Sequence, residues 1–259
     1  MSKLEHNVLT EDQLVSYHEN GFLVISDLYT ELERSSFLSA IRRHANADFA
    51  AILNPDREEE LLVSDERPKS DITLEEISQT STMCQKIISN PKTISSLRQI
   101  QNKDIVFLSS QMIFKEAGSN YASQAWRPHQ DNRYIDNENG QYITVNWFLR
   151  DSNPSNGGIY AYPGSHKLPI LPAPDVKSFR EKPGTNPGRE CQIPEEFVDK
   201  KLDLHLSAGD VVILHGNCIH GSYANNSGRS RPWYSACYIT EGEYFNIGRN
   251  SKRIPITFP

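Results

Sequence analysis

The second half of the chain, beyond Lys103, is divided into short apolar runs that are rich in β-branched and aromatic residues and separated by Gly, Pro and Asn. Runs of this length and composition, repeated at short intervals, are typical of the strands of a sandwich or barrel. We therefore expect a mainly β fold with these runs in its core. They are Ile105–Leu108, Gln111–Phe114, Tyr142–Leu149, Gly158–Tyr162, Leu202–Leu206 and Asp210–Leu214.

The first hundred residues carry signals for helices. Thr10–Gln13 has the spacing of a capping box, and Gly21 is placed to end the helix that this box begins. The run Phe22–Ile25 predicts a buried strand, and Thr30–Glu33 is a second box that leads into a further helix. Asn90 followed by proline is a good N-cap for another helix. We expect these helices to brace the β core.

The length and charge of the chain limit its class. A chain of 259 residues can bury one large core, so we expect a single domain, with helical support over about 1–102 and a β core over about 103–259. The net charge of -6 is spread along the sequence without a long basic run. This pattern argues against nucleic acid or an anionic membrane as a partner and favours a small molecule, and it leaves the oligomeric state open.

The sequence also bears on the compartment. No apolar run approaches the length of a membrane span, and the first residues lack a secretory signal, so we expect a cytoplasmic protein. The cysteines are far apart and show no C-x-x-C spacing, which argues against disulfides and against a structural zinc site. We expect reduced thiols that mostly fill the core: Cys84, Cys191, Cys218 and Cys237.

An imidazole and a carboxylate stand two residues apart in the segment Trp126–Asp131. In an extended strand, residues i and i+2 point to the same face, so His129 and Asp131 can reach one point together. Two histidines and one carboxylate form the facial triad of non-haem Fe(II) oxygenases. Since the pair supplies only two of these ligands, the sequence predicts a third ligand elsewhere.

The segment after Gly209 offers two candidates for the missing imidazole, His215 and His220, and both follow a buried β run. Eleven residues past His220 comes Arg231, at the start of another apolar run. A guanidinium beside a metal suits a carboxylate cosubstrate, because arginine binds carboxylates through two parallel hydrogen bonds. Arg229 is the rival to Arg231 for this role, and otherwise a solvated turn residue.

Several motifs, taken in order, resemble the phytanoyl-CoA dioxygenase family of Fe(II)/2-oxoglutarate oxygenases. The resemblance covers nearly the whole chain. It is carried by Asn20-Gly-Phe-Leu-Val-Ile, His129-Gln-Asp131, Val145-Asn-Trp-Phe-Leu-Arg-Asp, Asn156-Gly-Gly-Ile-Tyr-Ala-Tyr-Pro-Gly-Ser-His-Lys167, Gly209-Asp-Val-Val and His220-Gly-Ser followed by Arg231.

The resemblance implies a double-stranded β-helix, or cupin-like jelly roll, that holds iron through His129, Asp131 and His220. His220 is preferred to His215 because Gly-Ser and Arg231 follow it at the family spacing. His166 is then expected in a turn. The implied cofactors are Fe(II), 2-oxoglutarate and O2, with ascorbate as a stimulant. Related halogenases lack the carboxylate, so the presence of Asp131 favours hydroxylation.

By the same matching, Arg231 binds the far carboxylate of 2-oxoglutarate and Ser222 adds a hydrogen bond. Gln111 and Thr144 fall where family members place polar groups near that cosubstrate. Trp147 falls where the family often has an aromatic wall, although a tryptophan in such a run can equally belong to the core.

Polar residues around the metal motif suggest the substrate. We expect a polar, partly cationic mouth to the site and hence a small anionic or zwitterionic substrate such as an amino acid or an organophosphonate. The alternatives are natural-product tailoring, which includes desaturation or ring chemistry, and a non-catalytic jelly-roll metal-binding protein. The expected mouth residues are Arg127, Asn132, Arg133, Tyr134 and Asn146, with Tyr160 beside them.

The segment Lys167–Lys200 is rich in proline and has little periodicity. Long segments of this kind within a compact domain are usually functional lids or disordered. We expect a lid over the iron that orders when cosubstrate and substrate bind and that shields the reaction from water.

Overall fold

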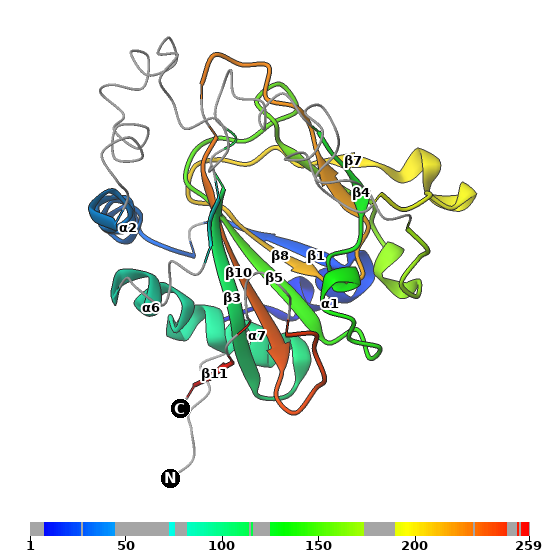
Figure 1. The fold of residues 1–259 in the computed structure, drawn as a ribbon, viewed down its shortest axis with the longest axis horizontal. Coiled ribbons are helices and arrows are strands. Elements are labelled where there is room, and N and C mark those ends of the chain that lie inside the picture. The colour runs from blue at the N-terminus through cyan, green and yellow to red at the C-terminus, as the bar shows by residue number, and fades with distance from the viewer. Residues whose placement is uncertain are drawn as a thin grey trace.

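The computed structural model describes residues 8–26, 28–44, 73–75, 82–113, 115, 125–173, 190–229, 231–247, 253 and 255–258. Two antiparallel sheets form its centre, with a layer of helices on the outer face of the larger sheet (Figure 1). Among the described residues, the helices are all too short or too polar to cross a membrane.

The larger sheet has seven strands in the described part of the chain, in the order β1-β8-β5-β10-β3-β11, and β2 also pairs with β3. Two of its central strands are buried along their whole length, so their sequences do not alternate between buried and exposed positions. The strands are β1 (Phe22–Ile25), β8 (Val211–His215), β5 (Tyr142–Phe148), β10 (Trp233–Thr240), β3 (Ile105–Ile113), β11 (Ile256–Thr257) and β2 (Thr73–Glu75).

The smaller sheet contains the sequence motifs for the metal site. Its order is β4-β9-β6-β7, and its strands are short. Strands β4 and β7 lie across from the larger sheet (Figure 1). The bounds are β4 (Trp126–His129), β9 (His220–Ser222), β6 (Ile159–Ala161) and β7 (Leu202–Asp203), and three 3-10 helices, η2 (Asp131–Tyr134), η3 (Ser165–Lys167) and η4 (Glu195–Lys200), lie in the connections.

Local signals set the first elements as the sequence predicts. Helix α1 (Glu11–Asn20) begins with a complete capping box between Thr10 and Gln13. It ends at Gly21, whose φ of 81° is left-handed and therefore favours glycine. Strand β1 follows directly and pairs with β8, so the N-terminal segment supplies a strand to the larger sheet as well as helices.

Two further helices also begin at their predicted caps. Helix α2 (Glu31–His44) starts where the Thr30 hydroxyl accepts from Glu33 N at 3.2 Å and the Glu33 carboxylate accepts from Thr30 N at 2.7 Å. Helix α7 (Pro91–Gln101) starts at Asn90, whose side chain caps Lys92 N. With α6 (Thr82–Ile88), these helices cover the face of the larger sheet that lies away from β4.

Two features differ from the sequence expectations. The runs Ile105–Leu108 and Gln111–Phe114 were expected as separate strands, but Ile105–Ile113 form one continuous strand, β3, because Ser109 and Ser110 keep the backbone extended between them. Phe114 lies outside the described residues. The sequence over 72–90 has a weak helical pattern, and this segment contains helix α6, but it begins with the short strand β2. Three residues are too few to show an alternation, so the pattern could not reveal this strand.

Some expectations concern residues outside the described ranges. The predicted lid, Lys167–Lys200, is described only at its two ends, over 167–173 and 190–200. The lid therefore remains a prediction, as does the division of the chain at about residue 102. Of the cysteines, Cys191, Cys218 and Cys237 are buried free thiols, as expected, whereas the side chain of Cys84 lies outside the described set.

Candidate metal centre and cosubstrate site

His129, Asp131 and His220 are brought together where the smaller sheet meets η2. His129 is the last residue of β4 and pairs directly with His220, the first residue of β9. Opposite residues of antiparallel strands have neighbouring side chains, so the pairing aligns the two imidazoles. The expectation that Asp131 continues the strand is wrong, because the strand ends at His129. Gln130 remains extended, and Asp131 opens η2.

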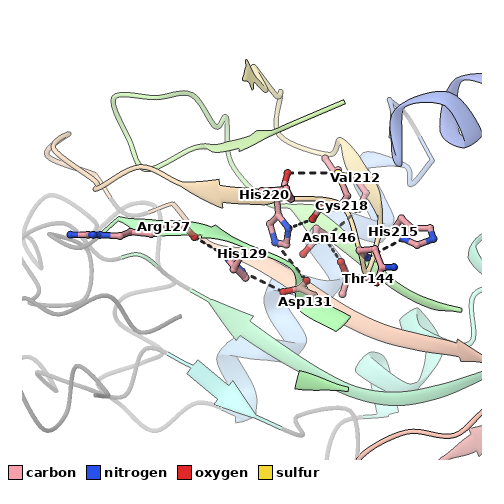
Figure 2. A network of polar contacts seen from close by, with 11 residues as sticks. Arg127, His129, Asp131, Thr144, Asn146, Val212, His215, Cys218 and His220 are labelled. Atoms are coloured by element: carbon pink, nitrogen blue, oxygen red, sulfur yellow. Dashed lines mark hydrogen bonds and ion pairs between the residues drawn. The ribbon is translucent and has the colours of Figure 1, made fainter. Parts of the chain in front are cut away.

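The three side chains converge on one point (Figure 2). Nε2 of His129 lies 3.4 Å from Oδ1 of Asp131, and Nε2 of His220 lies 3.6 Å from Oδ2. One ligand atom from each residue falls within 4.8 Å of the others. Within the described ranges this is the one such cluster of His, Cys, Asp and Glu side chains.

Backbone carbonyls fix the orientation of both imidazoles. Nδ1 of His129 lies 2.7 Å from the Arg127 carbonyl, and Nδ1 of His220 lies 3.0 Å from the Cys218 carbonyl. A carbonyl only accepts hydrogen bonds, so each Nδ1 carries its hydrogen and each Nε2 presents a lone pair. Metal-binding histidines are commonly held in this way. Both Nε2 atoms face Asp131.

The charge states also suit a metal. Burial lowers the pKa of His220 to about 4, although the Asp131 carboxylate opposes the shift, so the imidazole is neutral at neutral pH. Burial raises the pKa of Asp131, but His220 and His129 outweigh this effect and leave that pKa below its usual range. Two imidazoles and one carboxylate are the donor set of a facial triad, so these residues fit Fe(II).

The rival ligand His215 lies elsewhere. It ends β8, its ring lies 5.1 Å from the ring of His166, and its Nδ1 accepts from Asn217 N at 3.0 Å. Burial lowers its pKa to about 4. His166 belongs to η3, as expected of a turn residue, and its Nε2 lies 3.2 Å from the His18 carbonyl.

A cavity opens beside the three converging side chains, between the two sheets. Its volume is about 80 Å³. Its wall combines apolar side chains with a few polar ones. The lining residues, apart from the three above, are Ile113, Trp126, Asn146, Ile159, Leu214, Gly221, Ser222, Trp233 and Ser235.

Two buried cations lie close to this wall. The guanidinium of Arg231 is fully buried, lies 4.1 Å from the ring centre of Trp233 and donates to the carbonyl of Gly157. Lys115, which the sequence reading did not single out, is also fully buried and donates to Ser222 Oγ at 2.8 Å. The sequence signal for Lys115 was a single cation directly after the apolar run that becomes β3.

Strand β5 carries two of the other residues expected near the cosubstrate, Thr144 and Trp147, and they lie on opposite faces of the strand. Thr144 and Asn146 lie two apart on β5 and share a face, and Asn146 donates to Thr144 Oγ1 at 3.1 Å. Gln111 pairs with Ser235 in the backbone register, but its side chain is outside the described set. Trp147 is on the opposite face, as strand alternation requires.

Trp147 is a core residue and does not form a wall of the cavity. Its ring stacks on Tyr29 at 4.3 Å and on Phe37 at 5.0 Å, between the larger sheet and the first helices. The expected role beside the cosubstrate was wrong, because the face of a strand residue follows from a register that one run cannot reveal.

The expected mouth residues are dispersed. Asn146 lines the cavity, and the ring of Tyr134 lies 6.5 Å from that of His129. Arg127 points away from the metal ligands and pairs with Glu190 at 2.8 Å (Figure 2). Arg133 lines a separate surface pocket with Leu171 and Pro194.

Asn132 and Tyr160 also have structural partners. Asn132 is fully buried and binds Asn137 and Asn217, so its expected place at the mouth was wrong. The hydroxyl of Tyr160 donates to the Trp126 carbonyl at 3.2 Å. The cationic mouth expected from the sequence is therefore not formed by the described residues.

The family model of phytanoyl-CoA dioxygenase matches residues 17–233. The chain belongs to the phytanoyl-CoA dioxygenase family. A phytanoyl-CoA dioxygenase of Arabidopsis thaliana is 34% identical over 133 residues, which are 50% of this chain and 43% of that protein. The chain thus spans about half the length of the first relatives it matches. The ectoine dioxygenase of Bordetella bronchiseptica is 23% identical over 88% of this chain and 73% of its own length.

Solved structures agree with the fold. The epimerase SnoN, in complex with Fe3+, alpha-ketoglutarate and nogalamycin RO, superimposes with a TM-score of 0.69 at 18% identity, over 96% of this chain and 94% of SnoN. Identity this low shows the fold alone. The family membership and the jelly-roll fold expected from the sequence are confirmed.

Proposed function

We propose that this protein is an Fe(II)/2-oxoglutarate-dependent dioxygenase that hydroxylates a C–H bond of a small polar metabolite. The observation that carries the proposal is the convergence of His129, Asp131 and His220, whose ligand atoms lie within 4.8 Å of one another beside a cavity. Membership of the phytanoyl-CoA dioxygenase family supports the same chemistry.

The chain's own residues prepare the metal site. The carbonyls of Arg127 and Cys218 hold both imidazoles with Nε2 toward the iron, and Asp131 supplies a negative charge that balances part of the metal's charge. Bound iron and 2-oxoglutarate supply oxidation of the substrate by O2, coupled to the conversion of 2-oxoglutarate into succinate and CO2. The protein contributes binding, orientation and exclusion of side reactions.

Arg231 and Ser222 are assigned to the far carboxylate of 2-oxoglutarate. Ser222 lines the cavity two residues after His220 on β9, so a ligand bound at the metal lies within reach of its hydroxyl. Arg231 is buried against the lining residue Trp233. Two of its donors are directed at the carbonyls of Asn156 and Gly157, which fixes the guanidinium in place.

The cavity supports a small substrate that has a polar group. Asn146 and Ser235 offer amide and hydroxyl groups on the larger sheet. These groups suit a small polar metabolite such as an amino acid or an organophosphonate. An anionic substrate would also need a cationic partner at the mouth of the cavity.

A second candidate is the tailoring of a natural product by hydroxylation, desaturation or ring chemistry. The apolar part of the cavity wall, formed by Trp126, Ile113 and Ile159, favours this reading, because such a wall suits a ring or an alkyl portion. A narrower specificity for amino acids would leave these side chains without a role in substrate binding.

The deciding experiment measures succinate release after Fe(II), 2-oxoglutarate and ascorbate are added, with and without each member of a panel of metabolites. We expect slow uncoupled turnover that a true substrate stimulates. Polar metabolites and apolar ring compounds form the two halves of the panel, which separates the two candidates. A protein that binds Fe(II) but releases no succinate under any condition would be a non-catalytic jelly-roll binding protein.

A further inference from the structure

Lys115 lies in an unusual environment for an ammonium group. Its side chain is fully buried and donates to Ser222 Oγ at 2.8 Å and to the Tyr223 carbonyl. Among the described residues, no carboxylate forms an ion pair with it. A charge buried without a counterion is costly, and burial followed by the charge of Arg231 holds the pKa of Lys115 well below its usual range.

The surrounding structure holds Lys115 firmly in this position. Its backbone has a positive φ of 39°, which non-glycine residues rarely adopt. Its carbonyl accepts from Asn225 Nδ2 at 2.7 Å. Its stem passes over Gly157, where a Cβ atom would come within 2.7 Å of the lysine Cδ, and the Gly157 carbonyl accepts from Arg231. The side chains of Lys115 and Arg231 therefore both lie against Gly157.

The hydrogen bonds of Ser222 link this lysine to the cavity. A serine hydroxyl has one hydrogen to donate and two lone pairs, and Lys115 occupies one lone pair because its Nζ donates to Ser222 Oγ. In the part of the chain that the structure describes, no protein group accepts the Ser222 hydrogen. Since Ser222 lines the cavity, this hydrogen is available to an acceptor bound there.

We propose that Lys115 is a positioning residue of the cosubstrate site, which fixes the Ser222 hydroxyl as a donor to the far carboxylate of 2-oxoglutarate. The inference rests on the proposed use of 2-oxoglutarate. It gives the buried ammonium a counterion that arrives with the ligand. It also explains why Ser222 lies beside a lysine. Without the hydrogen bond from Lys115, the Ser222 hydroxyl could rotate and direct its hydrogen away from the cavity.

The test compares two 2-oxo acids that differ at the far end. In the anaerobic Fe(II) protein, binding of 2-oxoglutarate and of 2-oxobutyrate, which lacks the second carboxylate, is followed through the metal-to-ligand charge-transfer band. Lys115→Met should weaken 2-oxoglutarate binding on the order of 10- to 100-fold, the worth of a hydrogen bond to a charged group. Binding of 2-oxobutyrate and of Fe(II) should remain as in the wild type.

Two controls separate positioning from a structural role. Lys201→Met makes the same change at an exposed lysine that lies over the rings of Tyr160 and Tyr223, and it should leave both acids unaffected. The melting temperature of Lys115→Met without cosubstrate should equal or exceed that of the wild type, because a buried charge has been removed. Lys115→Gln provides a second neutral variant if the Lys115→Met protein does not fold.

The route through Ser222 is tested with a double variant. Once Lys115 is methionine, adding Ser222→Ala should weaken 2-oxoglutarate binding hardly further, because the two residues act as one unit. Additive losses, equal losses for both acids, or unchanged 2-oxoglutarate binding in Lys115→Met would each overturn the inference. Failure of both acids to bind the wild-type Fe(II) protein would instead overturn the proposed function.

Discussion

Two pairs of neighbouring histidines, each at least partly buried, lie at different places in the jelly roll, and they look alike at first. The rings of His129 and His220 are 4.4 Å apart, and those of His166 and His215 are 5.1 Å apart. Burial lowers the pKa of one member of each pair, His220 and His215, to about 4. Proximity, burial and a neutral imidazole therefore do not distinguish a metal centre from packed histidines.

The partners of the ring nitrogens do distinguish them. His220 directs Nδ1 at a carbonyl, so its Nε2 presents a lone pair toward the Asp131 carboxylate. His215 accepts the Asn217 N–H at Nδ1, so in the neutral ring Nε2 carries the hydrogen and has no lone pair for a metal. The backbone next to each histidine thus selects the tautomer, and the tautomer decides whether the residue can be a ligand.

The largest expected effect tests this difference at the ligands themselves. His129→Ala, Asp131→Ala and His220→Ala should each abolish turnover, because a facial triad has no ligand to spare. Fe(II) affinity should fall by more than about a hundredfold. Loss of a group that only orients a metal ligand already lowers metal affinity roughly 10- to 100-fold, and loss of the ligand itself should cost more. Equilibrium dialysis with Fe(II) under anaerobic conditions measures it.

His215→Ala is the matched control for His220→Ala. Both substitutions remove an imidazole whose pKa lies near 4, but only one removes a lone pair that faces Asp131. We expect His215→Ala to keep measurable turnover and its Fe(II) affinity. Loss of Fe(II) binding in His215→Ala with normal binding in His220→Ala would reverse the assignment.

The next effect concerns the cosubstrate. Arg231→Ala should raise the dissociation constant of 2-oxoglutarate at least about a hundredfold, because losing one partner of a buried charge pair costs on the order of 3 to 5 kcal/mol. Arg231→Lys should fall between the wild type and alanine, since lysine lacks the planar fork. Anaerobic titration of the Fe(II) protein with 2-oxoglutarate measures both, and Fe(II) affinity should hardly change.

Arg229 supplies the control for this substitution, because it is an exposed arginine in the turn that precedes Arg231. Arg229→Ala should bind 2-oxoglutarate as the wild type does. Tight binding in Arg231→Ala together with a large loss in Arg229→Ala would move the carboxylate site to the turn.

The sequence predicted those parts of the fold that local chemistry decides. The capping boxes at Thr10 and Thr30, the N-cap at Asn90 and the C-cap at Gly21 each act within a few residues, so their pattern is visible in the chain itself. The order of motifs predicted the family and the three residues that the structure brings together.

Contacts set by strand pairing were not predictable in the same way. Trp147 and Asn146 are neighbours in sequence, but alternation sends one into the core and the other to the cavity. Lys115 follows β3 of the larger sheet and meets Ser222 of the smaller sheet across 107 positions of sequence, a contact that no local pattern encodes. The expectation that Asn132 lies at the mouth fails because the side chain is held by Asn137, just after η2, and by Asn217, which lies between β8 and β9 and is distant in sequence.

A smaller effect should appear in the pH dependence of stability at the second histidine pair. The pKa of His215 is lowered from 6.5 to about 4, so the unfolded chain takes up a proton at higher pH than the folded protein does. Stability should therefore fall as the pH drops from about 6.5 to about 4, by on the order of 2 to 3 kcal/mol from this residue.

His215→Asn isolates the contribution, because the amide oxygen can still accept from Asn217 N. Urea unfolding of the metal-free wild type and of metal-free His215→Asn between pH 7 and pH 4 gives the free energy of unfolding of each protein as a function of pH. His166 and His220 titrate in each of them, so only the difference reports on His215. Curves that stay parallel over the whole range would mean that His215 is not held neutral by burial.

The smallest effect is expected at Arg127, which contributes its carbonyl, and not its side chain, to the metal centre. The carbonyl accepts from His129 Nδ1, while the guanidinium forms an ion pair with Glu190 in which both side chains are well exposed, 61% and 41%. Arg127→Ala keeps the carbonyl. Stability should therefore change by less than about 1 kcal/mol, as for other exposed pairs, and Fe(II) affinity should not change. Glu190→Ala is the control, since it breaks the same pair from the other side. If Arg127→Ala alone raised the KM of the substrate tenfold or more, the guanidinium would be a substrate-binding group that leaves Glu190 when the substrate arrives. If Arg127→Ala alone weakened Fe(II) binding, the orientation of His129 would depend on the side chain as well as on the backbone.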